Sequence, residues 1–256
     1  MTPATSFDLD SYITHHLSDS QEWHIPFLPT IHIPEFISLH VIMLLICSII
    51  LFVLFVILYD KKSRVPKGIT NLLEIFIIFI RDEIAIAYLG EKDGKKMAPL
   101  FCNFFFFILI LNIMGLIPLF STATANINVT AALALITFFF MIFGTIYKNG
   151  IQGFFKALIP SGVPIPVLFL LVPIEFIGLF IKSFALTIRL FANMLAGHIV
   201  ILSLLGIVVL MGFAALPIIL LALGISLLEV LVAFLQAYIF TLLSAMFIGQ
   251  MHHPEH

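Results

Sequence analysis

An arginine stands inside one of the longest apolar stretches of the sequence. In residues 173–210 the strongly polar types are limited to Glu175, Lys182, Arg189, Asn193 and His198. Insertion scales put an arginine at the centre of a membrane at about +2.5 to +3.5 kcal/mol. A guanidinium cannot be deprotonated in proteins, so Arg189 is interpreted as a permanent charge. Such a charge usually faces a protein partner or a water-filled cavity.

Other polar residues follow Arg189 along one helical face. Glu175, Lys182 and Arg189 are seven residues apart and Asn193 follows at four, so they share one side of a 3.6-residue helix. Small residues close to this stripe would let a partner helix approach: Gly178, Ala185, Ala192 and Ala196. An internal ion pair between Glu175 and Lys182 is the alternative for those two residues. Arg189 has no acid three or four residues away, so its charge must be met from elsewhere.

A second set of polar residues predicts proton transfer. His198 is nine residues past Arg189, on the opposite side of the helix. In the next apolar stretch, Glu229 and Gln236 are seven residues apart and share a face. A carboxylate and an imidazole inside a membrane are the usual parts of a proton relay, with Gln236 as a neutral partner. The alternative for His198 is a hydrogen-bonded packing residue.

Three further polar or thiol features bear on function less directly. Asn126 and Asn128 could line the entrance of the relay, or they could serve only turn chemistry. The two cysteines lie in apolar runs and indicate neither a disulfide framework nor a metal site. Three tail histidines could bind a metal, although a solvated tail is the favoured interpretation: His252, His253 and His256.

The composition is that of a polytopic membrane protein. The 256 residues are 62% hydrophobic and 10% charged, with mean hydropathy +1.20. A soluble domain carries about 25% charged residues. The first residues are polar and acidic without a basic region, so no ordinary signal peptide is expected.

The apolar runs predict an all-α polytopic membrane protein. We expect three transmembrane helices at 36–59, 98–119 and 129–147, because about 20 apolar residues cross a bilayer. Residues 69–89 carry a polar face between two basic flanks, which predicts an amphipathic helix on the cytoplasmic surface, with a short crossing helix as the alternative. Residues 173–210 and 218–249 are too long for upright spans, since they would measure about 57 and 48 Å. They predict a hairpin of two strongly tilted helices, and several shorter spans are the alternative.

The basic residues predict the orientation. Residues 1–35 hold no Lys or Arg, and 61–67 hold four. By the positive-inside rule, 1–35 form an extracytoplasmic segment before the membrane domain 36–256, whose tail is cytoplasmic. Ten of the twelve basic residues then fall in cytoplasmic loops or on the surface helix, and Lys182 and Arg189 are the exceptions.

These motifs resemble the a subunit of F-type ATP synthases. The most specific is Arg189-Leu190-Phe191-Ala192-Asn193-Met194-Leu195-Ala196-Gly197-His198. Three more occur in the family's order: 112–118 (NIMGLIP), 125–130 (ANINVT), and Glu229 with 235–240 (LQAYIF). The likeness covers nearly all the chain after residue 36. The His198 and Glu229 pair is exchanged relative to many bacterial members, as in mitochondrial ones.

The resemblance implies a mechanism. Arg189 would face a rotating ring of c subunits with Lys182 and Asn193, attract each deprotonated ring carboxylate, and keep two half-channels apart. Protons would enter past Asn126, Asn128, His198, Gln236 and Glu229 and leave near Glu175. This stator subunit of the F0 sector would couple proton flow to rotation and ATP synthesis, without making or breaking a covalent bond itself. It would need no cofactor.

The resemblance also implies partners and a location. The partners would be the c ring, the b subunits of the peripheral stalk, other F0F1 subunits and lipid, but no nucleic acid. The location would be the bacterial inner membrane, or alternatively the mitochondrial inner membrane. A stand-alone ion-coupled transporter or channel is the competing function, but the sequence shows no inverted repeat. An intramembrane enzyme would need a catalytic motif that the sequence does not contain.

Overall fold

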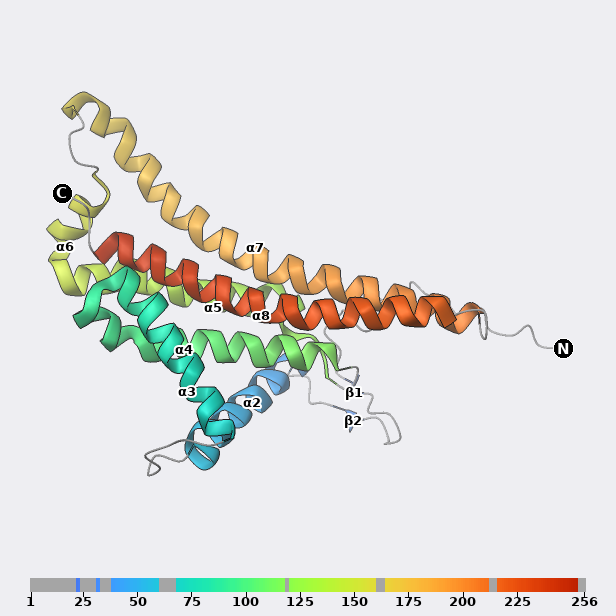
Figure 1. Cartoon of the computed structure of the whole chain (residues 1–256). Coiled ribbons are helices and arrows are strands. Elements are labelled where there is room, and N and C mark those ends of the chain that lie inside the picture. Colours follow the sequence, from blue (N-terminus) through green and yellow to red (C-terminus); the bar gives the residue numbers. More distant parts are fainter. Residues whose placement is uncertain are drawn as a thin grey trace.

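A computed structural model of the chain describes residues 22–23, 31–32, 38–59, 68–117, 120–159, 164–211 and 216–252. Almost all of these residues are helical (Figure 1). The exception in regular structure is an antiparallel pair of two-residue strands, β1 (Glu22–Trp23) and β2 (Ile31–His32). The all-α expectation is therefore confirmed for the membrane part, and this short ribbon was not anticipated.

The first helix lies at an angle beside the main bundle (Figure 1). Helix α2 (Leu39–Phe52) begins at Ser38, whose hydroxyl accepts a hydrogen bond from the His40 amide at 3.2 Å. A π-helical segment, η1 (Val53–Leu58), continues it without a break. One face of α2 packs on α4 through Met43 and Cys47, and the other face is exposed and apolar.

The next two helices form a tight hairpin at a glycine. Helix α3 (Ile69–Phe79) and the π-helical segment η2 (Ile80–Ile86) lead into α4 (Ala87–Leu116). At Gly90 the backbone leaves the helical region with φ 76°, which favours glycine. The chain then turns back on itself, so that a Cβ at Gly94 would lie 2.6 Å from the carbonyl oxygen of Ala85. A helix thus ends near Gly90, close to the end of the predicted segment 69–89, and the place of that segment on the cytoplasmic surface stays a prediction.

The third predicted transmembrane helix, 129–147, continues past its predicted limits at both ends. The short 3-10 turn η3 (Ala123–Ala125) follows α4, and helix α5 (Ile127–Phe139), π-helical segment η4 (Phe140–Gly144) and α6 (Thr145–Ala157) then run on together. Gly150, with φ 73°, breaks this run near its end. The helix is longer than the predicted 129–147 because Lys148, which marked the predicted end, lies inside α6 and does not end it.

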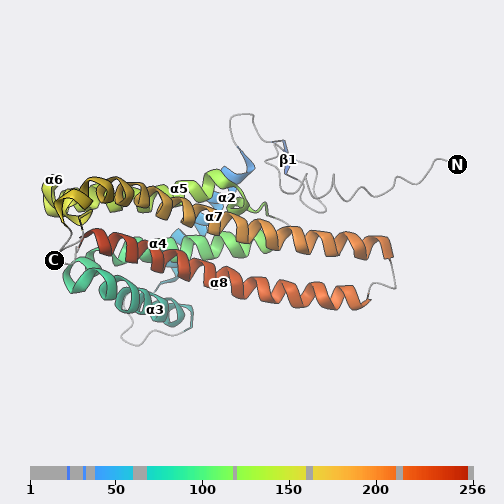
Figure 2. The same cartoon turned by 90° about the horizontal axis from the view of Figure 1, so that it is seen from above.

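Two long helices complete the chain. Helix α7 (Ile165–Met211) has 47 residues and α8 (Leu216–His252) has 37. The two helices run side by side beyond the other helices, and the first turns of α7 diverge from the bundle (Figures 1 and 2). The expected hairpin is present, but α7 begins eight residues before the predicted start at Pro173. Proline is tolerated inside membrane helices, where neighbouring groups satisfy the released carbonyl.

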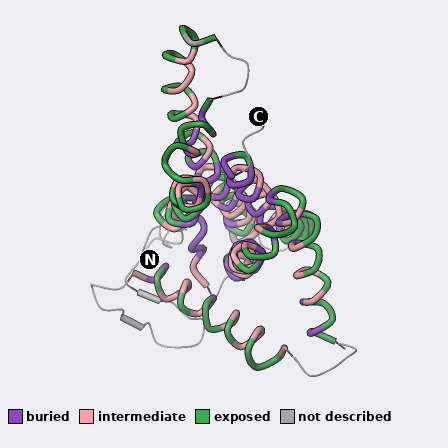
Figure 3. Tube along the Cα trace, turned by 90° about the vertical axis from the view of Figure 1, so that its left-hand side faces the viewer, coloured by how far each residue is buried: buried purple, intermediate pink, exposed green. Residues whose placement is uncertain are grey.

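The core is built mainly from aromatic residues, and the outside is apolar. Phe101, Phe104, Phe105 and Phe240 are fully buried where α4 packs against α8. Figure 3 shows buried residues on the inner sides of the helices and exposed residues on the outer sides. Five helical runs are long and apolar enough to cross a membrane: 39–58, 69–116, 127–157, 166–208 and 216–252. An outer surface of this kind fits a protein surrounded by lipid.

Candidate functional site

Arg189 lies on the exposed side of α7. The exposed residues on the same face of the helix within two turns of it are small and apolar: Ala185, Ala192 and Ala196. Within the described residues its guanidinium makes no hydrogen bond or ion pair, as the absence of a nearby acid in the sequence predicts. A permanent charge on an apolar surface requires an anionic or polar partner from outside this chain.

The other residues of the predicted stripe divide between two environments. The Lys182 ammonium donates to Oε1 of Gln250 at 3.1 Å and lies 5.5 Å from the Phe247 ring, so it turns toward α8. Glu175 is half-buried and forms no ion pair among the described residues, so the suggested pairing of Glu175 with Lys182 is absent. Asn193 is half-buried one turn beyond Arg189.

His198 faces inward, toward the chain that joins α4 to α5. Its ring nitrogens lie 3.3 Å from the hydroxyl oxygen of Thr122. The same hydroxyl donates to the carbonyl of Gly115 on α4 at 3.3 Å. Thr122 is 3% exposed, so it links the imidazole to α4 inside the protein. Sequence reasoning missed Thr122, whose only signal was its place in an uncharged loop between two motifs.

Glu229 packs directly against α7 at Gly197, the residue before His198. A Cβ at Gly197 would overlap Oε1 of Glu229 and would lie 2.8 Å from its Cδ. Only a glycine leaves room for this carboxyl group between the two helices. Glu229 is 5% exposed, and neither of its oxygens has a hydrogen-bond partner among the described residues. Gln236, two turns further along α8, is also 5% exposed, and its amide nitrogen lacks a partner in the same sense.

Two more buried polar side chains near the His198 link have unfilled hydrogen-bonding capacity. Asn112 on α4 is fully buried, and neither atom of its amide has a partner in the described part of the chain. The hydroxyl of Thr124, in η3 against α7, is also buried and has no hydrogen-bond partner among the described residues. Buried polar groups are normally satisfied, and ordered water commonly does this. A bound water molecule could therefore satisfy each of these side chains.

The two loop asparagines have different positions. Asn126 is the N-cap of α5, and its side-chain oxygen accepts from the Asn128 amide at 2.9 Å. Asn126 is half-buried, and Asn128 is exposed at the start of α5. The turn interpretation thus holds for Asn126, and an additional place at a channel entrance stays a prediction for both.

His198 and Glu229 have the chemistry to move protons, and Arg189 lies on a different surface of α7 from their contacts. His198 and Glu229 contact residues inside the protein, whereas Arg189 is on the outer face of the same helix. No cluster of three metal-ligating side chains occurs in the ranges that the structure covers. Of the three tail histidines, only His252 lies within those ranges.

Comparison with known proteins identifies a single family. The family model described as ATP synthase A chain matches residues 40–249. ATP synthase subunit a of Chloroherpeton thalassium is 46% identical over 258 residues, which cover 94% of this chain and 77% of that protein. The subunit of Myxococcus xanthus is 39% identical over 94% of this chain and 88% of its own length.

Some relatives are longer. The subunit of Anaeromyxobacter dehalogenans strain 2CP-C is 48% identical over 226 residues, which are 84% of this chain but 58% of that protein. The chain thus spans little more than half the length of that relative. The family match covers every residue of the candidate site, from Asn112 to Gln236. The chain belongs to the ATP synthase A chain family.

Proposed function

We propose that this chain is the stator subunit of the F0 sector of an F-type ATP synthase. It conducts protons through two half-channels to and from the carboxylates of a c-subunit ring and couples their flow to rotation. The observation that carries the proposal is the position of Arg189: a guanidinium without a partner among the described residues, on an exposed face of α7, backed by a half-buried His198 and a buried Glu229. A membrane transporter working alone would leave that charge facing lipid.

Arg189 acts electrostatically. A ring carboxylate that has lost its proton is attracted to the guanidinium as it crosses the low-dielectric interface, where such attraction is strong. The same charge repels protons and so prevents the half-channels from joining. One charge that crosses 100 mV supplies about 2.3 kcal/mol, which rotation of the ring can use.

The residues divide between entry and exit. Five side chains line the entry path: Asn126, Asn128, His198, Gln236 and Glu229. Water held by Asn112 and Thr124 connects them. Glu175, half-buried and without an ion pair among the described residues, marks the exit on the other side of Arg189. Asn193 and the apolar residues beside Arg189 face the ring. Lys182 was expected there too, but its bond to Gln250 gives it a structural role between α7 and α8.

The proposal includes assembly and location. The b subunits of the peripheral stalk and the other F0F1 subunits are partners, and other subunits make ATP. We place the chain in a bacterial inner membrane, because the three relatives compared above are bacterial, with residues 1–35 outside and the C-terminus in the cytoplasm.

The test is proton-driven ATP synthesis by the whole complex in membrane vesicles carrying Arg189→Ala. We expect synthesis to disappear while the complex still assembles, and passive proton leak to rise. Arg189→Lys, which keeps a charge but not the planar guanidinium, is the matched variant. Near-normal synthesis by the assembled Arg189→Ala complex would show that Arg189 is structural, and the proposed mechanism would be wrong.

A further inference from the structure

A cavity of about 470 Å³ opens between α2, α3 and α4. Its walls are apolar where Leu51 and Phe55 of the first helix face Ile77 of α3 and Pro99 of α4. The volume falls within the range of about 300–1,000 Å³ that small-molecule sites occupy. The described residues that line it do not include any from α7 or α8, so it is separate from the site above.

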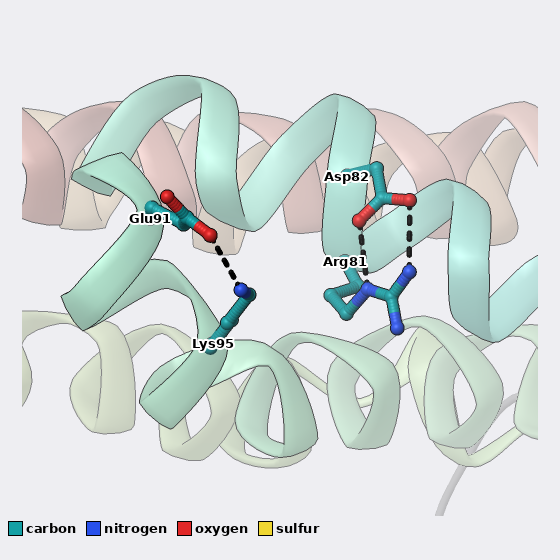
Figure 4. Close-up of polar contacts among 4 residues, drawn as sticks. All are labelled: Arg81, Asp82, Glu91 and Lys95. Atoms are coloured by element: carbon teal, nitrogen blue, oxygen red, sulfur yellow. Dashed lines mark hydrogen bonds and ion pairs between the residues drawn. The ribbon is translucent and has the colours of Figure 1, made fainter.

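Two cations line this cavity, and each already has an acid beside it. Arg81 donates from Nε and Nη2 to Asp82 at 2.7 and 2.9 Å, and Lys95 donates to Glu91 at 2.6 Å (Figure 4). All four side chains are at least 42% exposed, so they are open to a ligand. The two cations that line the polar end of the cavity are therefore each neutralised by a neighbouring carboxylate, Asp82 or Glu91.

The polar groups are arranged along the cavity as an amphiphile requires. Arg81 and Lys95 lie near the Gly90 turn, the end of the hairpin that also carries exposed Lys92 and Lys96. Asn103 lines the cavity eight residues past Lys95, about 12 Å deeper along α4. Deeper than the charged residues, the cavity is thus lined by the Asn103 amide, the Cys102 thiol and apolar side chains.

We propose that this cavity binds a phospholipid with an ethanolamine headgroup. The phosphate accepts from Arg81 and Lys95, and the ammonium donates to Asp82 and Glu91. An acyl chain lies along Leu51, Phe55 and Ile77, while the Asn103 amide reaches the ester region. A purely anionic headgroup would leave both carboxylates facing like charge, and a choline headgroup has no N–H to donate to them.

The experiment measures lipid retention on the purified whole complex by native mass spectrometry. The probes are dioleoyl phosphatidylethanolamine, phosphatidylglycerol and phosphatidylcholine, each titrated separately. We expect the ethanolamine lipid to be retained at the lowest concentration. The double variant Arg81→Gln with Lys95→Gln should raise the half-saturating concentration about tenfold or more, since a charge-assisted hydrogen bond is worth about that factor.

Two controls keep the proposal falsifiable. Lys92→Gln with Lys96→Gln removes the same amount of charge from the same α3–α4 hairpin outside the cavity and should leave retention unchanged. Cys102→Trp fills the cavity without altering its charges and should abolish photo-crosslinking of a diazirine-acyl ethanolamine lipid to α2 and α4.

Three results would overturn the inference. The two double variants could behave alike, or the glycerol or choline lipid could be retained as tightly as the ethanolamine lipid. The photolabel could instead attach elsewhere while a transmembrane helix of another subunit crosslinks to Cys102, in which case the occupant is protein.

Discussion

At the scale of single residues, the contact between Gly197 and Glu229 sets the position of the buried carboxyl group. Gly197→Ala would place a methyl group where Oε1 now lies. We expect proton-driven ATP synthesis to fall about tenfold or more, because a displacement of about 1 Å in a reacting group can cost about a hundredfold.

The variant matched to Gly197→Ala shortens the acidic side chain at position 229. Glu229→Asp withdraws the carboxyl group by one methylene, so the double variant Gly197→Ala with Glu229→Asp should recover part of the rate that Gly197→Ala loses. If the double variant is slower than both single variants, steric overlap is not the cause of the loss.

The residues of this site were predictable to different degrees. Arg189, His198 and Glu229 stood out because a polar group in an apolar run is rare and its helical spacing is easy to compute. Thr122 did not, because a threonine in a loop carries no signal of burial. Its role depends on the fold bringing residues 76 positions apart to within 3.3 Å.

At the scale of helices, glycines allow close packing at the end of the bundle near the Gly90 turn. A Cβ at Gly249 of α8 would lie 2.5 Å from the carbonyl oxygen of Tyr88. Because that atom is backbone, it cannot move aside without displacing the α3–α4 turn. We expect Gly249→Ala to destabilise the chain by about 1–3 kcal/mol.

The measurement is thermal unfolding of the purified complex in detergent, followed through a label on α8. Each kcal/mol should lower the melting temperature by about 2–4 °C. Gly224→Ala is the control on the same helix, since a Cβ there meets nothing within 4 Å. Equal melting temperatures for the two variants would rule out tight packing at Gly249.

Helix positions were predictable, but helix ends were not. The length of the apolar runs predicts both long helices, yet Pro173, the predicted start of the first one, lies inside α7. In water a proline usually ends a helix, whereas in a membrane the backbone has no alternative hydrogen-bond partner. Conversely, Gly90 is a sharper break than any proline in the described helices, and the predicted segment 69–89 ends directly before it.

At the scale of the whole molecule, polar and basic side chains from distant parts of the sequence meet at one end. Lys148 of α6 pairs with Asp93 of α4 at 2.6 Å and donates to the carbonyl of His252 of α8 at 3.3 Å. Lys182 reaches Gln250 at the same end of α8. It therefore joins the basic end of the bundle, although it counted as an exception in the sequence. The positive-inside rule predicts that this end is cytoplasmic.

That orientation is testable with two positions on one helical run. Ile127 and Tyr147 are 44% and 94% exposed and lie 20 residues apart, or about 30 Å, which is the thickness of a bilayer core. In a background with Cys47→Ala and Cys102→Ala, a membrane-impermeant maleimide should label Ile127→Cys in intact cells. It should label Tyr147→Cys only in inverted vesicles. The reverse pattern would place the basic end outside and would exchange the entry and exit paths on either side of Arg189.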